Sequence, residues 1–341
     1  MQAIRMEAFG GPEVLRLLEI DRPEPGPGQV LIRVESAAVN FADVMRRRDD
    51  LYPFPTELPF IPGSEVAGTV EALGDGVEGP PPGTPVFAVV GGDGSTGYAQ
   101  FAVADAQQVI PIPPGLSPDE AAGMVIAGTT AMLVLSDVAK LQPGESVLVG
   151  GAGGGVGILA VQIARSLGAG TVIGLASSGD RRSAALEAGA DHVVDPGDAG
   201  WSDEVRDLTG GAGVGVVLEM SGGQVFADGL TTLAPFGRFV VYGMASGLPG
   251  VFDEAGQQAF FYRPSLGQSL HVFNLGLYFG LRPGAAIEAM TALIGLVASG
   301  QVKVPVGTTL PLEEAAEAHR LIESRQSTGK VILRPWAGSP A

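Results

Sequence analysis

The stretch Gly151-Ala152-Gly153-Gly154-Gly155-Val156-Gly157 decides the fold of this chain. It directly follows the apolar run 146–149, and it opens a segment whose apolar residues recur with the 3.6-residue period of a helix. Strand, glycine turn and helix in this order are the context that a dinucleotide-binding fingerprint requires, because the backbone must approach a pyrophosphate at the helix N-terminus. The sequence therefore predicts a site for a nicotinamide or flavin dinucleotide.

The turn is a variant of the pattern G-x-G-x-x-G, with Ala152, Gly154 and Gly157 at the three glycine positions. Gly154 lets the main chain touch a phosphate, and Gly157 lets the helix pack tightly on its strand. A strand predicted at 171–175 completes a βαβ unit of about thirty residues. The alternative is a glycine-rich turn that holds no ligand. We expect cofactor contacts from Ala152, Gly154, Gly155, Val156 and Gly157.

The end of the second strand indicates which nucleotide is preferred. An acidic residue that holds a ribose 2′-hydroxyl belongs about twenty residues after the turn, but Ala176-Ser177-Ser178 occupies that place, followed by Arg181 and Arg182. Hydroxyl groups can hydrogen-bond a 2′-phosphate, and a guanidinium can pair with it through two bonds. These residues favour NADP(H) over NAD(H), with Ser177 and Arg181 as contacts. The alternative for the arginines is a solvated first helical turn, partly neutralised by Asp180.

Composition and charge exclude several classes of protein. The chain has 341 residues, enough for about two domains. Its 37 acidic and 20 basic residues give a net charge of −17, which argues against nucleic acid or an anionic membrane as a partner. The absence of cysteine excludes disulfides and thiolate metal sites. The N-terminus lacks a signal-peptide core and glycine and threonine interrupt the longest apolar stretch, 121–135, so we expect a soluble cytoplasmic protein without a membrane span.

The pattern of the chain changes along its length. Residues up to about 120 form short alternating or β-branched runs between Pro/Gly turns, which predicts an antiparallel, barrel-like β domain. From there to about 262, helices alternate with strands, which is typical of a doubly wound parallel sheet. The remainder contains two helical stretches, 285–299 and 312–324, and closes with the short strand 329–333. We expect that strand to return to the first domain, because it is too short and isolated to form a sheet alone.

Five motifs follow one another in a recognisable order: Asn40-Phe41-Ala42-Asp43-Val44-Met45-Arg46, Leu51-Tyr52-Pro53, Pro62-Gly63-Ser64-Glu65-Val66-Ala67-Gly68-Thr69-Val70, residues 152–157, and Gly329-Lys330-Val331. As a set they resemble the zinc-independent quinone oxidoreductase branch of the medium-chain dehydrogenase/reductase superfamily, over nearly the whole chain. The resemblance implies an α/β fold with a GroES-like, β-barrel-type catalytic domain, residues 1–122 and 263–341, interrupted by a Rossmann domain, residues 123–262. It further implies NADPH as hydride donor in the cleft between the domains, and usually a homodimer.

The residues present indicate that no metal is used. Zinc-dependent members of that superfamily carry a histidine in the place of Ser64, and cysteines complete their sites. This chain has no thiol, so neither a soft sulfur ligand nor an imidazole is available to bind a metal together with Glu65. Hydride delivery to a quinone or conjugated enone needs only an electrophilic acceptor held against the nicotinamide C4. The expected partner is therefore a small electrophilic molecule.

Three residues are candidates for the catalytic chemistry. The resemblance places Asn40 and Asp43 beside the nicotinamide or substrate. Their i, i+3 spacing puts them on one face of a helix start, where Asn40 as N-cap and Asp43 in the first turn is the structural alternative. The hydroxyl of Tyr52 can stabilise and protonate the oxyanion that hydride transfer creates. Ordinary packing beside Pro53 is its alternative.

Further contacts with the nicotinamide half follow from the resemblance. Thr130 has the alternative of capping a helix start, Lys330 is expected at a phosphate or carboxamide, and Arg263 belongs to a pattern that some quinone reductases share. The expected contacts of this group are Thr130, Tyr242, Gly243, Phe273 and Lys330.

Three functions remain open. The first is an NADPH:quinone oxidoreductase-like enzyme that transfers a hydride to a quinone or conjugated carbonyl. The second is an enoyl or alkenal reductase of the same superfamily, which Met45 and Leu133 favour because well-matched quinone reductases carry tyrosines in their places. The third is an NADPH-binding protein with little catalysis.

Overall fold

The computed structural model describes residues 1–50, 52–92, 95–247, 250, 252, 257, 260–261 and 266–337. The chain divides into two compact units. The first unit comprises Met1–Ile126 and Val304–Ala341, and the second comprises Ala127–Lys303.

The first unit is built on a seven-stranded sheet around the long strand β3 (Gln29–Val39). The start of β3 pairs with β6, its end pairs with β15, and β4 lies beside most of its length, all antiparallel. The expected return of the last strand is confirmed, because Val331 of β15 pairs with Val39. The other strands are β4 (Glu65–Leu73), β5 (Pro85–Val89), β6 (Phe101–Asp105), β7 (Val109–Pro111), β14 (Val306–Pro311) and β15 (Lys330–Arg334), with β1 (Gln2–Arg5) and β2 (Arg16–Glu19) forming a separate pair.

Valine, alanine and leucine side chains of these strands form the core of the first unit. Helix α1 (Phe41–Arg48) follows β3 directly, and α10 (Ala315–Glu323) contributes Ala315 and Ala318 to the core. Short 3-10 turns complete the unit: η1 (Pro12–Val14), η2 (Ala106–Gln108) and η6 (Leu312–Glu314). The alternating burial of β-branched residues explains why the sequence predicted an antiparallel domain here.

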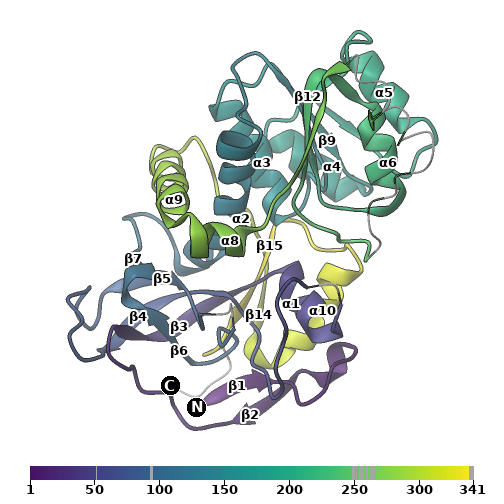
Figure 1. The fold of residues 1–341 in the computed structure, drawn as a ribbon. Coiled ribbons are helices and arrows are strands. Elements are labelled where there is room, and N and C mark those ends of the chain that lie inside the picture. Colours follow the sequence, from purple (N-terminus) through teal and green to yellow (C-terminus); the bar gives the residue numbers. More distant parts are fainter. Residues whose placement is uncertain are drawn as a thin grey trace. The chain divides into compact units, whose positions relative to one another are not determined.

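The second unit contains a six-stranded parallel sheet in the order β10-β9-β8-β11-β12-β13. The fold expected from alternating strands and helices is therefore confirmed. Figure 1 shows α5 and α6 on one side of this sheet and α3 on the other. The strands are β8 (Ser146–Val149), β9 (Thr171–Leu175), β10 (His192–Val194), β11 (Val214–Glu219), β12 (Leu233–Val241) and β13 (Ser269–Val272).

Aromatic residues fill one side of this second sheet. Trp201 of α5 and Phe226 of α6 pack with Phe239 of β12, and the rings of Phe226 and Phe239 lie 5.2 Å apart. The helices are α2 (Pro118–Leu133), continued by the π-helical turn η3 (Val134–Val138), α3 (Gly155–Ser166), α4 (Gly179–Glu187), α5 (Trp201–Leu208), α6 (Gly223–Thr231), α8 (Leu275–Leu281) and α9 (Pro283–Ala298).

The helix Pro118–Val138 is long and apolar enough to cross a membrane by length and composition. However, 78% of the most apolar 18-residue stretch of this helix is buried inside the fold. Such burial is typical of a helix that serves as core. The helix pair Leu275–Leu281 and Pro283–Ala298 passes the same test only when counted as one segment, and it bends by 115°.

The boundary near residue 263 differs from the sequence-based expectation. The expected boundary itself falls in 262–265, outside the described residues. Residues 266–303 belong to the second unit, whereas the sequence analysis assigned them to the catalytic domain. The physical reason is strand β13, which pairs in parallel with β12 from Ser269 to Val272 and so extends the Rossmann-type sheet.

Candidate functional site

The glycine turn adopts the compact geometry that a nucleotide-binding loop needs. The Ala152 N–H donates to the carbonyl of Leu175 on β9 over 2.9 Å, and Gly154 is the N-cap of α3. A Cβ atom on Gly157 would collide with the carbonyl oxygen of Gly151, so only glycine permits this packing of α3. The main-chain N–H groups of Gly155 and Val156 lie in the first turn of α3, where a helix offers them no partner of its own, and such groups suit an anion.

The two arginines beyond β9 have different surroundings. Ser177 is exposed, and Arg181 lies on the first turn of α4 against the glycine turn, where a Cβ on Gly153 would come within 2.7 Å of the Arg181 Cα. Arg182 instead donates to Asp195 over 2.8 Å and to the carbonyl of Ala176 over 3.2 Å. Arg181 is thus adjacent to the turn, while Arg182 is held by a carboxylate.

Three of the expected nicotinamide contacts lie at or just beyond the carboxyl ends of the second sheet. The Tyr242 hydroxyl donates to the carbonyl of Gly150 over 3.3 Å, and Gly243 follows it. Burial, and then the charge of Glu219, raise the pKa of Tyr242. The Phe273 N–H donates to the carbonyl of Val241 over 2.8 Å. These contacts bring the end of β12 and the residue after β13 to the same edge as the glycine turn.

Thr130 is buried in the interior of α2, which begins at Pro118. The alternative that Thr130 caps a helix start is therefore wrong. The glycine and threonines around Gly128 suggested a helix start because both residue types disfavour a helix interior. Packing of this apolar segment in the core overrides that preference.

Glu219 is a residue that the sequence analysis missed. It ends β11 and is only 3% exposed. Its Oε1 accepts from the N–H groups of Ser221 and Gly222, over 2.6 and 2.9 Å. Burial raises the pKa of Glu219, and the neighbouring main-chain N–H groups oppose that rise. Its position directly after the apolar strand 214–218 is the signal that could have identified it.

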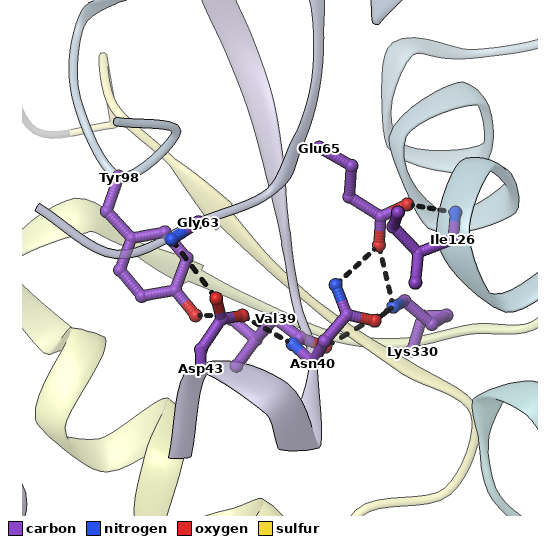
Figure 2. A network of polar contacts seen from close by, with 8 residues as sticks. All are labelled: Val39, Asn40, Asp43, Gly63, Glu65, Tyr98, Ile126 and Lys330. Atoms are coloured by element: carbon purple, nitrogen blue, oxygen red, sulfur yellow. Dashed lines mark hydrogen bonds and ion pairs between the residues drawn. The ribbon is translucent and has the colours of Figure 1, made fainter. Parts of the chain in front are cut away.

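Asn40, Glu65 and Lys330 form a polar cluster in the first unit, in which Glu65 and Lys330 are buried and Asn40 is half-buried (Figure 2). The Lys330 ammonium donates to Asn40 Oδ1 over 2.7 Å, to Glu65 Oε1 over 2.9 Å and to the carbonyl of Val39 over 3.3 Å. Asn40 Nδ2 donates to Glu65 Oε1 over 2.8 Å, and Glu65 Oε2 accepts from the N–H of Ile126 over 2.6 Å. These contacts fix which end of the Asn40 amide is oxygen. Three intrachain acceptors occupy the ammonium of Lys330.

Asp43 lies beside this cluster and is completely buried. Its Oδ2 accepts from the Asn40 N–H over 2.9 Å and from the Tyr98 hydroxyl over 3.1 Å, while Oδ1 accepts from the Gly63 N–H over 3.1 Å. Burial raises the pKa of Asp43 to about 6, against the effect of these donors. Asn40 is the N-cap of α1, so Asp43 holds the residue that begins the helix.

His319 extends the network and was not recognised from the sequence. Its Nε2 lies 3.2 Å from the Tyr98 hydroxyl, and its Nδ1 lies 3.3 Å from Arg47 Nη1. Burial and the charge of Arg47 lower the pKa of His319 to about 3. Arg47 continues to Glu323 through two hydrogen bonds of 2.6 and 3.1 Å. No periodic pattern in the sequence links His319 to Asp43, because 276 positions separate their regions of the chain.

Tyr52 lies after α1, in a segment without regular structure. Its ring packs edge-on against Phe54, with 6.0 Å between centroids, and the Arg46 guanidinium lies 5.3 Å from its centroid. The structure therefore groups Asn40, Asp43 and Lys330 in one polar network, while the ring of Tyr52 contacts Phe54 and Arg46. Arg263 lies outside the described residues.

Comparison with known proteins gives consistent matches over both units. Residues 26–114 match the family described as alcohol dehydrogenase GroES-like domain, and residues 155–272 match the family described as zinc-binding dehydrogenase. The quinone oxidoreductase of Rattus norvegicus is 34% identical over 335 residues, which cover 98% of this chain and 97% of that protein. The 2-haloacrylate reductase of Burkholderia sp. is 33% identical over 335 residues, with coverages of 96% and 97%. The solved quinone oxidoreductase of Escherichia coli, complexed with NADPH, has a TM-score of 0.89 at 29% identity and covers 98% of this chain and 100% of its own.

The residues of this chain do not fit the zinc ion that one of these descriptions mentions. Both oxygens of Glu65 already accept hydrogen bonds, and its nearest cation is the ammonium of Lys330. His192 and His271 belong to the second unit, and His319 contacts Arg47 and Tyr98. Cysteine is absent from the chain, and no three His, Asp or Glu side chains of the described residues gather in a metal-like group. This donor set does not suit zinc.

Proposed function

This chain belongs to the quinone oxidoreductase branch of the medium-chain dehydrogenase/reductase superfamily, and from that premise we propose that it is an NADPH-dependent oxidoreductase that reduces a quinone or conjugated carbonyl without zinc. One observation carries the proposal: Arg181 lies against the glycine turn at Gly153, and Ser177 stands where NAD-binding chains place a carboxylate. A guanidinium at this place suits a 2′-phosphate.

The second unit has the parts that would hold the dinucleotide. Main-chain N–H groups of Gly155 and Val156 would bind the pyrophosphate, and Ser177 with Arg181 would bind the 2′-phosphate. Tyr242, Gly243, Phe273 and Thr130 are proposed contacts of the nicotinamide half. Bound NADPH would supply the hydride.

The first unit orients a polar amide. Lys330 and Glu65 hold the two ends of the Asn40 amide, and Asp43 holds its main-chain N–H. We infer that Asn40 positions the cofactor or substrate, and that Lys330 acts through Asn40 because its ammonium is saturated by three acceptors. The Tyr52 hydroxyl would donate a hydrogen bond, and then a proton, to the oxygen of the reduced acceptor.

Reduction of a conjugated C=C bond is the second candidate. The 2-haloacrylate reductase of Burkholderia sp. is nearly as similar to this chain as the rat quinone oxidoreductase, at 33% against 34% identity. In addition, Met45 and Leu133 stand at two positions where well-matched quinone reductases carry tyrosines, so both positions are aliphatic in this chain. An aliphatic enoyl or alkenal substrate would suit such surroundings.

Consumption of NADPH with three acceptor classes separates these functions. We expect oxidation of NADPH with 1,4-benzoquinone, and a comparison with 2-alkenals and acyl thioesters tells quinone reduction from C=C reduction. If the protein binds NADPH but consumes none with any acceptor, the third function, a binding protein with little catalysis, is correct. Dialysis against a chelator should leave the activity unchanged, and loss of activity restored by zinc would contradict the zinc-independent mechanism.

We also propose that the protein is a cytoplasmic homodimer. Support for the dimer comes from strand β13, whose outer edge pairs with no strand of the described chain. Support for the location comes from the composition, because a chain without cysteine forms none of the disulfides that are common in oxidising compartments.

A further inference from the structure

Glu219, at the carboxyl end of β11, has an unmet hydrogen-bonding requirement. Its carboxylate is 3% exposed, and Oε2 has no hydrogen-bond partner among the described residues. An ionised carboxylate has room for about four donors. A buried acceptor without a partner is unfavourable, and such atoms are rare in native proteins. A donor from outside the chain would remove this penalty.

The sheet topology places this oxygen at the switch point. Strand β8 lies between β9 on one side and β11 on the other, so the strand order reverses between β8 and β11. Ligands of doubly wound sheets bind outside the carboxyl ends of the strands at that point. The Gly150 N–H, just after β8, donates to the Leu218 carbonyl over 2.8 Å, and Glu219 is the next residue and the last of β11.

The order of the strands also indicates which part of the dinucleotide lies there. Ser177 and Arg181 follow β9, and the glycine turn follows β8. If the 2′-phosphate lies beyond β9 and the pyrophosphate at the turn, the nicotinamide half continues over β11. Its ribose hydroxyls and carboxamide NH2 group are hydrogen-bond donors. Oε1 already accepts from Ser221 and Gly222, which favours the ionised carboxylate and leaves Oε2 as an acceptor.

We propose that Glu219 is a cofactor-binding residue whose Oε2 accepts a hydrogen bond from the nicotinamide half of the bound dinucleotide. The inference rests on the proposed NADPH dependence. It adds a contact that the glycine fingerprint does not include, on a different strand from the turn.

The substitution Glu219→Gln tests this contact. One amide oxygen can still accept from Ser221 and Gly222, while an NH2 group, which is a donor, replaces Oε2. Dissociation constants are measured by titration calorimetry for NADPH, 2′-phospho-ADP-ribose and 2′,5′-ADP, without any substrate. We expect Glu219→Gln to weaken the binding of NADPH about tenfold or more and to leave the binding of 2′,5′-ADP unchanged. Of the three ligands, only 2′,5′-ADP lacks both the nicotinamide and the ribose attached to it. Weakening of 2′-phospho-ADP-ribose as well would identify a ribose hydroxyl as the donor, and no weakening of it would identify the carboxamide.

Other outcomes separate this inference from the proposed function. Equal affinities of the variant and the wild type for all three ligands, or an equal loss for all three, would overturn the role of Glu219. Failure of the wild type to bind any of them would overturn the NADPH dependence and this inference with it. Glu145→Gln, before the amino end of β8, is the matched control and should bind all three as the wild type does. If Glu219→Gln does not fold, Glu219→Asp keeps the charge, withdraws the oxygen by one methylene, and should show the same selective loss.

Discussion

Lys330 and Glu65 form an ion pair that is almost completely buried, with side-chain exposures of 4% and 0%. The stability of the fold depends on both partners of such a pair, because removal of one leaves the other as an uncompensated charge in the interior. We expect Lys330→Met to lower the free energy of unfolding by about 3–5 kcal/mol. Urea denaturation followed by circular dichroism measures the change.

A second substitution tells the ion pair from simple loss of packing. Glu65→Gln in the Lys330→Met background removes the unpaired charge, while the amide can still accept from Ile126. The double variant should therefore be more stable than Lys330→Met alone, which is strong non-additivity. If the two substitutions add, the pair is not the source of the stability.

Arg181 and Arg182 provide a matched test of nucleotide preference at the same scale. Arg181→Ala should weaken NADPH by about tenfold or more and NADH little, because only NADPH carries the 2′-phosphate. Arg182→Ala is the control, since Asp195 and the Ala176 carbonyl already engage that side chain. Fluorescence titration with both nucleotides measures the affinities. Equal losses for NADPH and NADH in Arg181→Ala would mean that this guanidinium does not contact a 2′-phosphate.

At the scale of elements, one line of hydrogen bonds joins α1 to α10. Arg47 of α1 can only donate, so His319 Nδ1 of α10 accepts and its Nε2 carries the proton. Nε2–H then donates to the Tyr98 oxygen, and the Tyr98 hydroxyl donates to Asp43. All donors therefore point toward Asp43, whose two oxygens accept from Tyr98, Asn40 and Gly63. The neutral state of His319 agrees with its lowered pKa.

This line predicts opposite pH effects from two residues. The pKa of His319 falls from 6.5 to about 3 on folding, so acidification below 6.5 destabilises the fold by up to about 5 kcal/mol through this residue. The pKa of Asp43 rises from 3.8 to about 6, so its contribution stabilises the fold as the pH falls from 6 toward 4, by up to about 3 kcal/mol. His319→Gln should flatten the loss of stability between pH 6.5 and 4, and Asp43→Asn should steepen it, each by about 1 kcal/mol per pH unit. Urea unfolding at several pH values gives these slopes, and identical slopes in both variants and the wild type would contradict the prediction.

The same elements mark how far the sequence could be interpreted. The turn 151–157 and helix α3 were predictable because a glycine pattern and a 3.6-residue period are local signals. Strand β13 was assigned to the wrong side of a domain boundary, since its partner β12 is set by a non-local parallel pairing that no local pattern encodes. The grouping of Lys330 with Asn40 and Glu65 was likewise hidden, because β15 and β3 are nearly 300 residues apart in the chain.

Some residues of the candidate site could be predicted from local sequence patterns, and others could not. Asn40 and Asp43 were recognised as neighbours because they share a helix face at spacing i, i+3, and their capping contact was among the alternatives. Tyr98 and His319 lie in an irregular segment and on a helix face that looks ordinary in sequence, so burial alone reveals them. Polar contacts between distant segments depend on the tertiary fold, and motif spacing cannot anticipate them.

At the scale of the whole molecule, apolar residues are exposed on strand β13 and on the two helices that follow it in the chain. Val272 on that strand is 81% exposed, and Leu281 and Ile287, on α8 and α9, are 77% and 64% exposed. An open strand edge offers unpaired main-chain groups to another chain, and exposed apolar side chains add buried area on association. A second copy presenting the same edge would pair with it around a twofold axis. These features support the proposed homodimer.

Val272→Lys tests that arrangement, because a twofold interface would bring the two new ammonium groups close together. Light scattering coupled to size exclusion should give twice the chain mass of 34.7 kDa for the wild type and the single mass for the variant. Leu186→Lys on α4 is the matched control, since Leu186 is also an exposed apolar residue, at 50%, but lies away from β13 in the chain and on another helix. It should remain dimeric. A monomeric wild type would refute the dimer, and a dimeric Val272→Lys variant would place the interface on another surface.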